Sequence, residues 1–398
     1  MKTINLLPVK PAERIEQIDI LRGFALLGIL MVNVFGYHAS FYHFSAFYGG
    51  LENAVDATFY KWMMALAADK FIFLFSFLFG YAFWMLQGKF PGDDKGFSHF
   101  YVRRMLSLGL IGLLHIIFLW AGDILFMYSL LGLVLLLIRK FKNTTLLSLA
   151  LISYFFTAGL LALRVWFPYL PDPVTTLTNL SMKDVTEVYA NGNFFDIMLM
   201  RINEYIIFRN INLLYYVPKI FSLFILGFLS GRMYFMNEIK QRLGFFTSIT
   251  VVFLIAGLLL TFKLETILML FSHPDSAFYM SIYIFIYESG NFFLGFGYLL
   301  LILLWSHKMW GLKILDPLKY AGRMALTNYL MQSLIFTTIF YAYGFGLFAQ
   351  VRPWQFLLWG LLVFIIQVII SKIWLTWFRF GPLEYIWRRM TYGRRLQK

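Results

Sequence analysis

The residues best suited to chemistry begin in one apolar run near the start of the chain. Asp19 and Arg22 stand at the head of this run and Asn33 near its far end. Charged and amide groups are costly inside a bilayer, so their presence in a long apolar run indicates a site. The Asn33 amide can stabilise the oxyanion of an acyl transfer or join two helices. Asp19 and Arg22, three residues apart, pair on one helix face and either orient the helix or take part in binding.

Three histidines and one glutamate are candidates for moving protons. His115 and Glu288 each lie about 15 Å inside a predicted span, near the middle of a bilayer, and imidazole is an uncharged base at pH 7. His38 and His43 follow the first apolar run in an aromatic-rich loop. Either of them can act as a general base on an acceptor hydroxyl or amine, or simply belong to an interfacial loop. Asn33, His38, His43, His115 and Glu288 are therefore the candidate catalytic residues.

Arginines beside the apolar runs are candidates for binding phosphate. Adjacent arginines next to a span hold either the phosphates of a cofactor or anionic lipid headgroups. The candidate cofactor-binding residues are Asp19, Arg22, Arg103, Arg104 and Arg323.

Other polar side chains lie within the spans or at their ends. Asp123, Asn328 and Gln332 are candidates for holding the substrate. Lys70, at a helix end, is expected to anchor its helix by reaching water.

These residues must be positioned by a membrane protein. The chain has 398 residues, of which 60% are hydrophobic and only 14% charged, too little polar surface for a soluble domain. It has no cysteine, which excludes disulfides, thiolate nucleophiles and cysteine metal sites. Because the sequence contains no glycine-rich phosphate loop, zinc spacing or Gly-x-Ser-x-Gly elbow, we expect no metal, nucleotide hydrolysis or serine-hydrolase chemistry.

The fold class is predicted to be all-α, a polytopic transmembrane bundle of about ten helices. Most of the 34 Lys and Arg fall on one side when the spans alternate from an inside N-terminus, which places both termini in the cytoplasm. The net charge of +14 is then explained by topology, and we expect no nucleic-acid partner. The apolar runs are 18–37, 70–87, 105–121, 124–138, 145–163, 213–231, 244–262, 277–305, 324–345 and 354–378.

Residues 1–398 are expected to form a single transmembrane domain. The one long polar stretch, 164–212, is predicted to be extracytoplasmic. Within it, 182–210 has the composition of an interfacial helix.

Five separated motifs in this chain resemble those of the YeiB family, bacterial multi-spanning membrane proteins catalogued as a domain of unknown function. The motifs are residues 19–29 with Asn33, 70–80, 114–125, 322–333 and 381–388. The opening motif also resembles those of heparan-alpha-glucosaminide N-acetyltransferase and of bacterial membrane O-acyltransferases, which pass an acyl group from cytoplasmic acyl-CoA across a membrane.

These resemblances imply roles for individual residues. In the N-acetyltransferase an asparagine has the spacing of Asn33 from Arg22, and a later histidine is implicated in transfer, for which His38 and His43 are the nearest matches. In the O-acyltransferases a histidine occupies the Asn33 position, and this chain departs from that pattern.

Two functions are predicted. The first is a transmembrane acyltransferase of the bacterial cytoplasmic membrane that moves an acyl group, acetyl in the simplest case, from cytoplasmic acyl-CoA to a small-molecule or glycan acceptor. Its partners are the lipid bilayer, acyl-CoA and the acceptor, and an oligomer is compatible with the sequence. The alternative is a proton-coupled transporter or exporter of a small molecule, with Glu288 and His115 as the proton relay.

Overall fold

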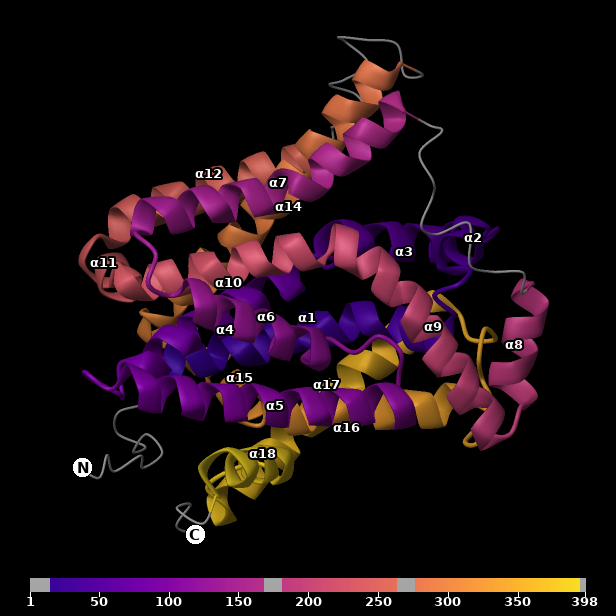
Figure 1. Cartoon of the computed structure of the whole chain (residues 1–398). Coiled ribbons are helices and arrows are strands. Elements are labelled where there is room, and N and C mark those ends of the chain that lie inside the picture. Colours follow the sequence, from indigo (N-terminus) through magenta and orange to yellow (C-terminus); the bar gives the residue numbers. More distant parts are fainter. Residues whose placement is uncertain (1–14, 168–180, 263–275, 394–398) are drawn as a thin grey trace.

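The computed structural model describes residues 15–167, 181–262 and 276–393. Every regular element in these ranges is a helix, so the predicted all-α class is confirmed (Figure 1). The helices are α1 Glu16–His38, α2 Phe44–Gly49, α3 Ala54–Leu66, α4 Lys70–Gln87, α5 Asp94–Phe118, α6 Leu125–Ile138, α7 Asn143–Trp166, α8 Met182–Asn191, α9 Phe194–Tyr215, α10 Val217–Arg232, α11 Phe235–Gln241, α12 Leu243–Phe262, α14 Ala277–Ser306, α15 Met309–Arg323, α16 Ala325–Phe340, α17 Pro353–Trp377 and α18 Pro382–Tyr392.

Helix α1 runs through the middle of the bundle. It packs against α4, α15, α16 and α17, and most of its residues are buried. The contact with α15 is unusually close, because a Cβ on Gly322 would lie 1.9 Å from the backbone oxygen of Asp19. Only glycine permits this approach, which joins the first motif of the sequence to the fourth.

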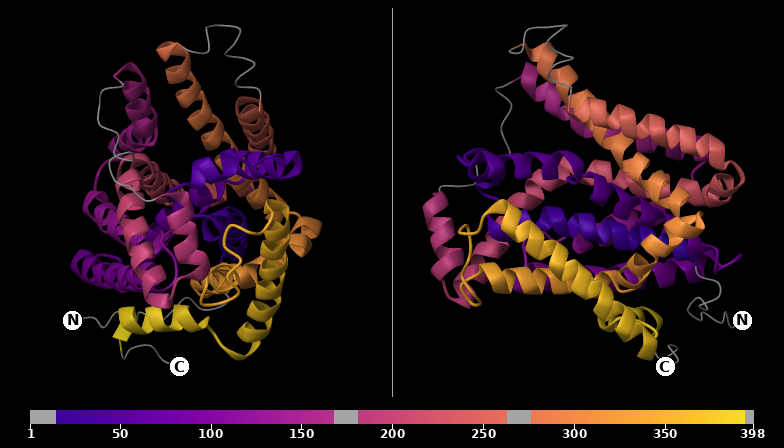
Figure 2. Two further views of the ribbon diagram at one scale, coloured as in Figure 1. Left: turned by 90° about the vertical axis from the view of Figure 1, so that its right-hand side faces the viewer. Right: turned by 180° about the vertical axis from the view of Figure 1, so that it is seen from behind.

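Helices α7, α12 and α14 form a second layer, tilted away from the layer around α1 (Figures 1 and 2). Helix α12 packs against α14, and α14 packs against α4 and α7. Only 17% of the apolar window of α12 is buried. An apolar helix so little covered by protein is expected to face lipid.

Seven helices, counted among the described residues, are long and apolar enough to cross a membrane, or eight if α10 and α11 form one bent span. The chain is thus a polytopic membrane protein. All ten predicted runs are helical, but α6 has 14 residues and α10 and α16 have 16 each. Helices of this length reach about 21 to 24 Å, short of a ~30 Å hydrocarbon core. The candidate spans among the described residues therefore number seven or eight where about ten were predicted.

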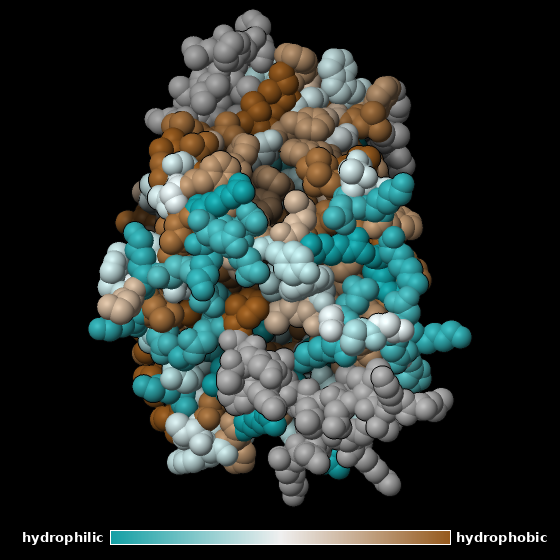
Figure 3. All heavy atoms as spheres, turned by 90° about the vertical axis from the view of Figure 1, so that its left-hand side faces the viewer, coloured by the Kyte–Doolittle hydropathy of each residue, from teal (hydrophilic) through white to brown (hydrophobic). Residues whose placement is uncertain are grey.

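The two ends of the bundle differ in composition. We call the end where α1 begins and α18 lies the α18 end, and the opposite end, with α2 and α8, the α2 end (Figure 2). Figure 3 views the α18 end and shows hydrophilic side chains across its middle, with apolar side chains above. The described chain begins and ends at this one end.

The stretch predicted as one interfacial helix, 182–210, is instead two helices, α8 and α9, interrupted at Gly192 and Asn193. A Ser181–Asp184 capping box fixes the start of α8. Arg201 and Glu204 of α9 are buried, so one face of α9 packs onto the bundle. The preceding part of the segment predicted to be extracytoplasmic, 168–180, lies outside the described residues.

Candidate functional site

A hydrogen-bonded Asp–His–Ser arrangement lies in the middle of the bundle. His115, near the end of α5, has its Nδ1 2.8 Å from Asp123 Oδ2 and its Nε2 2.8 Å from Ser333 Oγ on α16. The side chains of His115 and Asp123 are fully buried, and Ser333 is 0% exposed. A base oriented by a carboxylate and bonded to a hydroxyl is the arrangement that activates a hydroxyl for attack.

The chain of hydrogen bonds continues to α1. Tyr37 Oη lies 2.9 Å from Ser333 Oγ, and Tyr37 also shares a side-chain hydrogen bond with Asn33. The ring of Tyr37 is held between Trp120, with ring centroids 4.3 Å apart, and Phe336 at 5.7 Å. The hydrogen bonds can all run in one direction. Asn33 then donates to Tyr37, Tyr37 to Ser333, Ser333 to His115, and His115 to the Asp123 carboxylate. We call these five residues, Asn33, Tyr37, Ser333, His115 and Asp123, the polar chain.

The carboxylate end of the polar chain is fixed by backbone. Asp123 Oδ1 accepts a 2.7 Å hydrogen bond from the Phe126 amide at the start of α6, where the helix dipole favours a negative charge. Gly112 lets α5 approach this turn, because a Cβ there would lie 2.4 Å from the Phe126 nitrogen and 2.9 Å from Asp123 Oδ1. The sequence around Gly112 and His115 thus positions the imidazole against its carboxylate.

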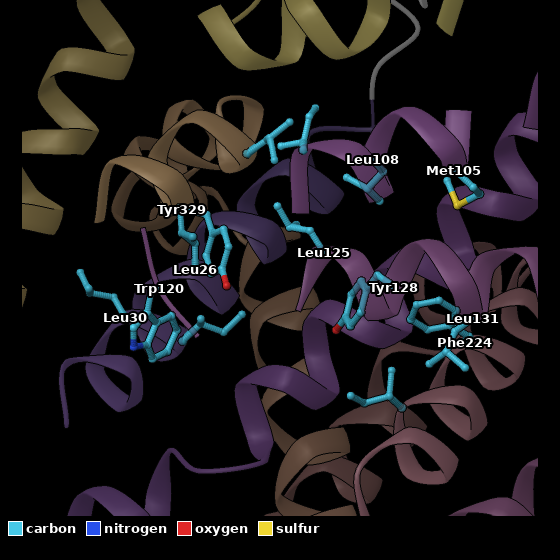
Figure 4. Packing of buried hydrophobic residues seen from close by; sticks show 14 of the residues in the cluster. Leu26, Leu30, Met105, Leu108, Trp120, Leu125, Tyr128, Leu131, Phe224 and Tyr329 are labelled. Carbon is cyan, nitrogen blue, oxygen red and sulfur yellow. The ribbon is translucent and has the colours of Figure 1, made fainter. Parts of the chain in front are cut away.

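A cavity of about 280 Å³ lies between the α18 end and the polar chain. Its inner wall is apolar and comes from α1, α4, α5, α6 and α16; Figure 4 shows six of these residues in the surrounding core. The six are Leu26, Met105, Leu108, Leu125, Tyr128 and Tyr329. On α1 the lining runs from Asp19 to Ile29, about 15 Å of helix, and Asn33 follows one turn later on the same face.

The outer part of the cavity is cationic. Six basic side chains line it against two acidic ones, Asp19 and Glu384. Asp19 is paired with Arg22 at 3.1 Å, as predicted, and Glu384 accepts the backbone amides that begin α16. The basic residues are Arg22, Lys89, Arg104, Arg323, Arg379 and Arg388.

Three of these arginines have no ion pair among the residues that the structure describes. The Arg104 guanidinium lies 3.7 Å above the ring of Trp387. The Nε of Arg323 is buried without a hydrogen-bond acceptor, and burial lowers the pKa of Arg388. Half-buried cations that outnumber the neighbouring carboxylates favour an anionic ligand.

Tyr329 separates the cavity from the polar chain. It lines the cavity, its ring centroid lies 5.3 Å from that of His115, and it precedes Ser333 by one turn of α16. Its hydroxyl donates a long 3.4 Å hydrogen bond to the Gly122 carbonyl. One aromatic ring therefore stands between the apolar end of the cavity and the imidazole.

Several predicted site residues lie elsewhere. Arg103 does not line the cavity; its Nε donates to the Met390 carbonyl at 2.7 Å and so fastens α18 to α5. Asn328 Nδ2 donates to Ser371 at 2.9 Å, and Gln332 Nε2 donates to Gln367 at 2.9 Å. The last two residues join α16 to α17, a placement that favours helix packing over substrate binding.

The histidines at the α2 end are not part of the polar chain. His38 Nε2 accepts the Val351 amide at 3.2 Å and Nδ1 lies 3.1 Å from the Tyr48 hydroxyl, so both nitrogens of this buried ring are occupied. His43 ends the loop before α2 and borders a small depression with Ser40 and Met182. The bonding of His38 favours a structural role.

Glu288 lies in a separate group of charges. Lys219 Nζ is 2.8 Å from Glu288 Oε2 and 3.3 Å from Asp69 Oδ2, and Asn291 Nδ2 is 3.5 Å from the same Asp69 oxygen. Lys70 is 0% exposed, which corrects the expectation that it reaches water, since α4, α10 and α14 enclose it. Asp69, Lys70, Lys219 and Glu288, here called the charge cluster, share no direct hydrogen bond with His115 among the described residues.

Sequence reasoning did not select Ser333, Tyr37 or Trp387 for the site. Ser333 and His115 are far apart in the chain, and although Ser333 ends the motif 322–333, nothing in that motif pairs the serine with a base. A signal did exist on α1, where Asp19, Arg22, Asn33 and Tyr37 recur at helical spacing on one face. Within the described residues no group of three or more His, Asp and Glu side chains is placed to hold a metal ion.

Comparison with known proteins gives relatives along the whole length of the chain. A protein of Bacillus subtilis (strain 168), "Uncharacterized protein YxaH", is 34% identical over 98% of this chain and 96% of its own length. "Uncharacterized protein YeiB" of Escherichia coli (strain K12) is 29% identical over 95% of this chain and 96% of its own. Residues 230–394 match the family described as "Protein of unknown function (DUF418)". The resemblance to YeiB is confirmed, and the chain belongs to the DUF418 family.

Proposed function

We propose that this chain is an acyl-CoA-dependent acyltransferase of the bacterial cytoplasmic membrane. The observation that carries the proposal is the cavity, which is cationic at its outer part, apolar at its inner part, and ends one ring away from an Asp-oriented histidine. An acyl-CoA has the same order of parts, with phosphates at one end and an apolar acyl thioester at the other.

Each part of the acyl-CoA has a matching region of the cavity wall. The phosphates would be bound by Arg104, Arg323 and Arg388, which lack ion pairs among the described residues. Arg22, held by Asp19, would add a fourth cation at the exposed mouth, where 31% of its side chain is accessible. The acyl group would follow the wall of Leu26, Met105, Leu108 and Leu125 toward Tyr329.

The polar chain would supply the acid–base chemistry. His115, oriented by Asp123, would remove a proton from a hydroxyl whose oxygen attacks the thioester carbonyl, and would then return this proton to the leaving thiolate of CoA. Tyr37 and Asn33 can donate hydrogen bonds to the oxyanion that forms between these steps. Because the cavity opens at the α18 end, where most Lys and Arg lie, the donor would come from the cytoplasm and the acceptor from the other side.

Binding of acetyl-CoA to the purified protein in detergent tests this function. We expect Arg104→Ala and Arg323→Ala to weaken binding about tenfold or more, since each removes a charged contact worth about 1.5 to 3 kcal/mol. Arg103→Ala is the matched control, because Arg103 is adjacent in sequence but lies outside the cavity. Equal losses in all three variants, or no binding by the unaltered protein, would contradict the proposal.

The charge cluster favours a second candidate, a proton-coupled transporter. Glu288 and two lysines buried together beside the half-buried Asp69 are costly in a membrane and typical of ion or proton pathways. If the chain is a transporter, Glu288→Gln should abolish proton-driven uptake of its substrate, and Arg104→Ala should leave this uptake intact. The acyltransferase would show the reverse order of sensitivity for CoA release.

A further inference from the structure

We propose that Ser333 accepts the acyl group as an oxygen ester before the acyl group passes to its final acceptor. The inference deepens the proposed function and rests on it. It adds a covalent intermediate, a nucleophile and an order of events to the acyl transfer.

The first observation is the geometry around Ser333. A serine hydroxyl is a weak nucleophile unless a neighbouring base takes its proton. Ser333 Oγ lies 2.8 Å from His115 Nε2, and the other ring nitrogen is 2.8 Å from Asp123. The carboxylate fixes the tautomer with the proton on Nδ1 and leaves the Nε2 lone pair facing the hydroxyl.

The second observation is that Ser333 does not bond in the way a helical serine usually does. In apolar helices a serine or threonine hydroxyl ordinarily donates to the carbonyl three or four residues earlier. Other hydroxyls of this bundle do so at short distances, 2.8 Å for Ser107, 2.6 Å for Ser129 and 2.7 Å for Thr250. The hydrogen bond from Ser333 Oγ to the Tyr329 carbonyl is much longer, at 3.5 Å, whereas His115 Nε2 lies only 2.8 Å from the same oxygen and is the better acceptor for its proton.

The third observation is a donor on the far side of the serine oxygen. Tyr37 Oη lies 2.9 Å from Ser333 Oγ and is itself bonded to Asn33. As the serine oxygen attacks, the Tyr37 hydroxyl is placed to shift its hydrogen bond to the oxygen of the thioester carbonyl. Asn33, expected to act as an oxyanion donor, would then act through or beside Tyr37.

The reaction balances without any further reactant besides an acyl-CoA and an acceptor. His115 takes the Ser333 proton, the Oγ–carbonyl bond forms, the carbon–sulfur bond breaks, and the thiolate leaves as CoA thiol with the proton from His115. In the second step the acceptor hydroxyl or amine gives its proton to His115 and attacks the ester. The ester bond breaks and the proton returns to Ser333, which restores the polar chain.

The acyl group reaches Ser333 only if Tyr329 moves. Its hydroxyl donates a 3.4 Å hydrogen bond to the Gly122 carbonyl and also meets the Ile124 amide, and α16 begins directly after the interruption at Met324. Displacement of this one ring would join the inner end of the cavity to the polar chain. The two steps then keep donor and acceptor apart, with CoA leaving toward the α18 end before the acceptor enters from the α2 end.

The test is acylation of the full-length protein with radiolabelled acetyl-CoA in detergent, without acceptor. Ser333→Cys is an informative variant, because the chain has no cysteine and position 333 would carry its only thiol. We expect the unaltered protein to release a burst of CoA thiol and to retain label that resists neutral hydroxylamine, as an oxygen ester does. Ser333→Cys should carry label that neutral hydroxylamine removes, as from a thioester, and Ser333→Ala and His115→Ala should bind acetyl-CoA but remain unlabelled.

The possible outcomes distinguish failure of the serine intermediate from failure of the proposed acyl transfer. Binding of acetyl-CoA and release of CoA without label, or label that persists in Ser333→Ala, would overturn the serine intermediate and leave acyl transfer standing. Absence of acetyl-CoA binding by the unaltered protein would overturn both. Size-exclusion elution of each variant at the position of the unaltered protein establishes that the comparison is between folded chains.

Discussion

The polar chain and the charge cluster are two buried polar regions of one bundle with opposite electrostatic designs. In the charge cluster two carboxylates face two lysines, and Lys219 lies within 3.3 Å of both acids. In the polar chain a single carboxylate is bonded to an imidazole and a backbone amide, and six basic side chains line the nearby cavity against two acidic ones. A cluster whose charges balance holds helices together, whereas a cavity with an excess of cations beside an oriented base is suited to an anionic ligand.

The largest expected effect breaks the polar chain. His115→Ala, or Asp123→Asn, should lower CoA release from acetyl-CoA about 10²- to 10⁴-fold, because each removes or misorients the base. Glu288→Gln, assayed per folded molecule, should stay within a few-fold of the unaltered protein. A thiol-release assay decides, and the opposite order of losses would assign the chemistry to the charge cluster.

The next effect breaks the charge cluster. Lys219→Met leaves Asp69 and Glu288 buried without their shared cation and should destabilise the fold by about 3 to 5 kcal/mol. Thermal unfolding in detergent measures it. The double change with Glu288→Gln should recover part of the loss, because it removes one uncompensated carboxylate. Equal stability of Lys219→Met and the unaltered protein would show that this cluster is not structural.

A smaller effect sharpens the role of positioning. Gly112→Ala introduces a Cβ 2.4 Å from the Phe126 nitrogen and should push α5 away from Asp123. A shift of about 1 Å in the imidazole would cost on the order of 10²-fold in turnover with acetyl-CoA affinity retained. Gly159→Ala is the matched control, since nothing lies within 4 Å of a Cβ built there. Equal turnover in the two variants would show that Gly112 does not position the imidazole of His115.

The last prediction tests a group outside both regions. Burial in the packing of α9 raises the pKa of Glu204 to about 7. The folded state then binds more protons than the unfolded state between about pH 4.5 and 7, so the free energy of unfolding falls as pH rises through this window. Glu204→Gln should flatten the slope in thermal unfolding scans and leave CoA release unchanged. The groups that face Glu204 are Ser40, the Phe41 and Tyr42 amides, Tyr189, Tyr341 and, one turn earlier on α9, Arg201.

Part of the fold and of the candidate site could be predicted from the sequence alone. The helices, the Asp19–Arg22 pair and the burial of His115 followed from apolar runs and the cost of charge in lipid. The partners did not, because contacts such as Ser333 with His115 depend on which helices are neighbours, and hydropathy carries no such information. Arg103 and Arg104 are adjacent in sequence, yet they leave α5 in different directions. Arg104 lines the cavity, whereas Arg103 donates to the Met390 carbonyl of α18. Lys70 was misjudged because α10 and α14 pack against α4 and bury its side chain.

The most direct test of the central claim is photo-crosslinking with an acyl-CoA that carries a photoreactive group at the end of its acyl chain. The account predicts label on the inner wall of the cavity, at Leu26 or Ile29 of α1 and Tyr329 of α16, and loss of this label when excess CoA is added. Label confined to the lipid-facing side chains of α12 and α17, and unaffected by CoA, would contradict it.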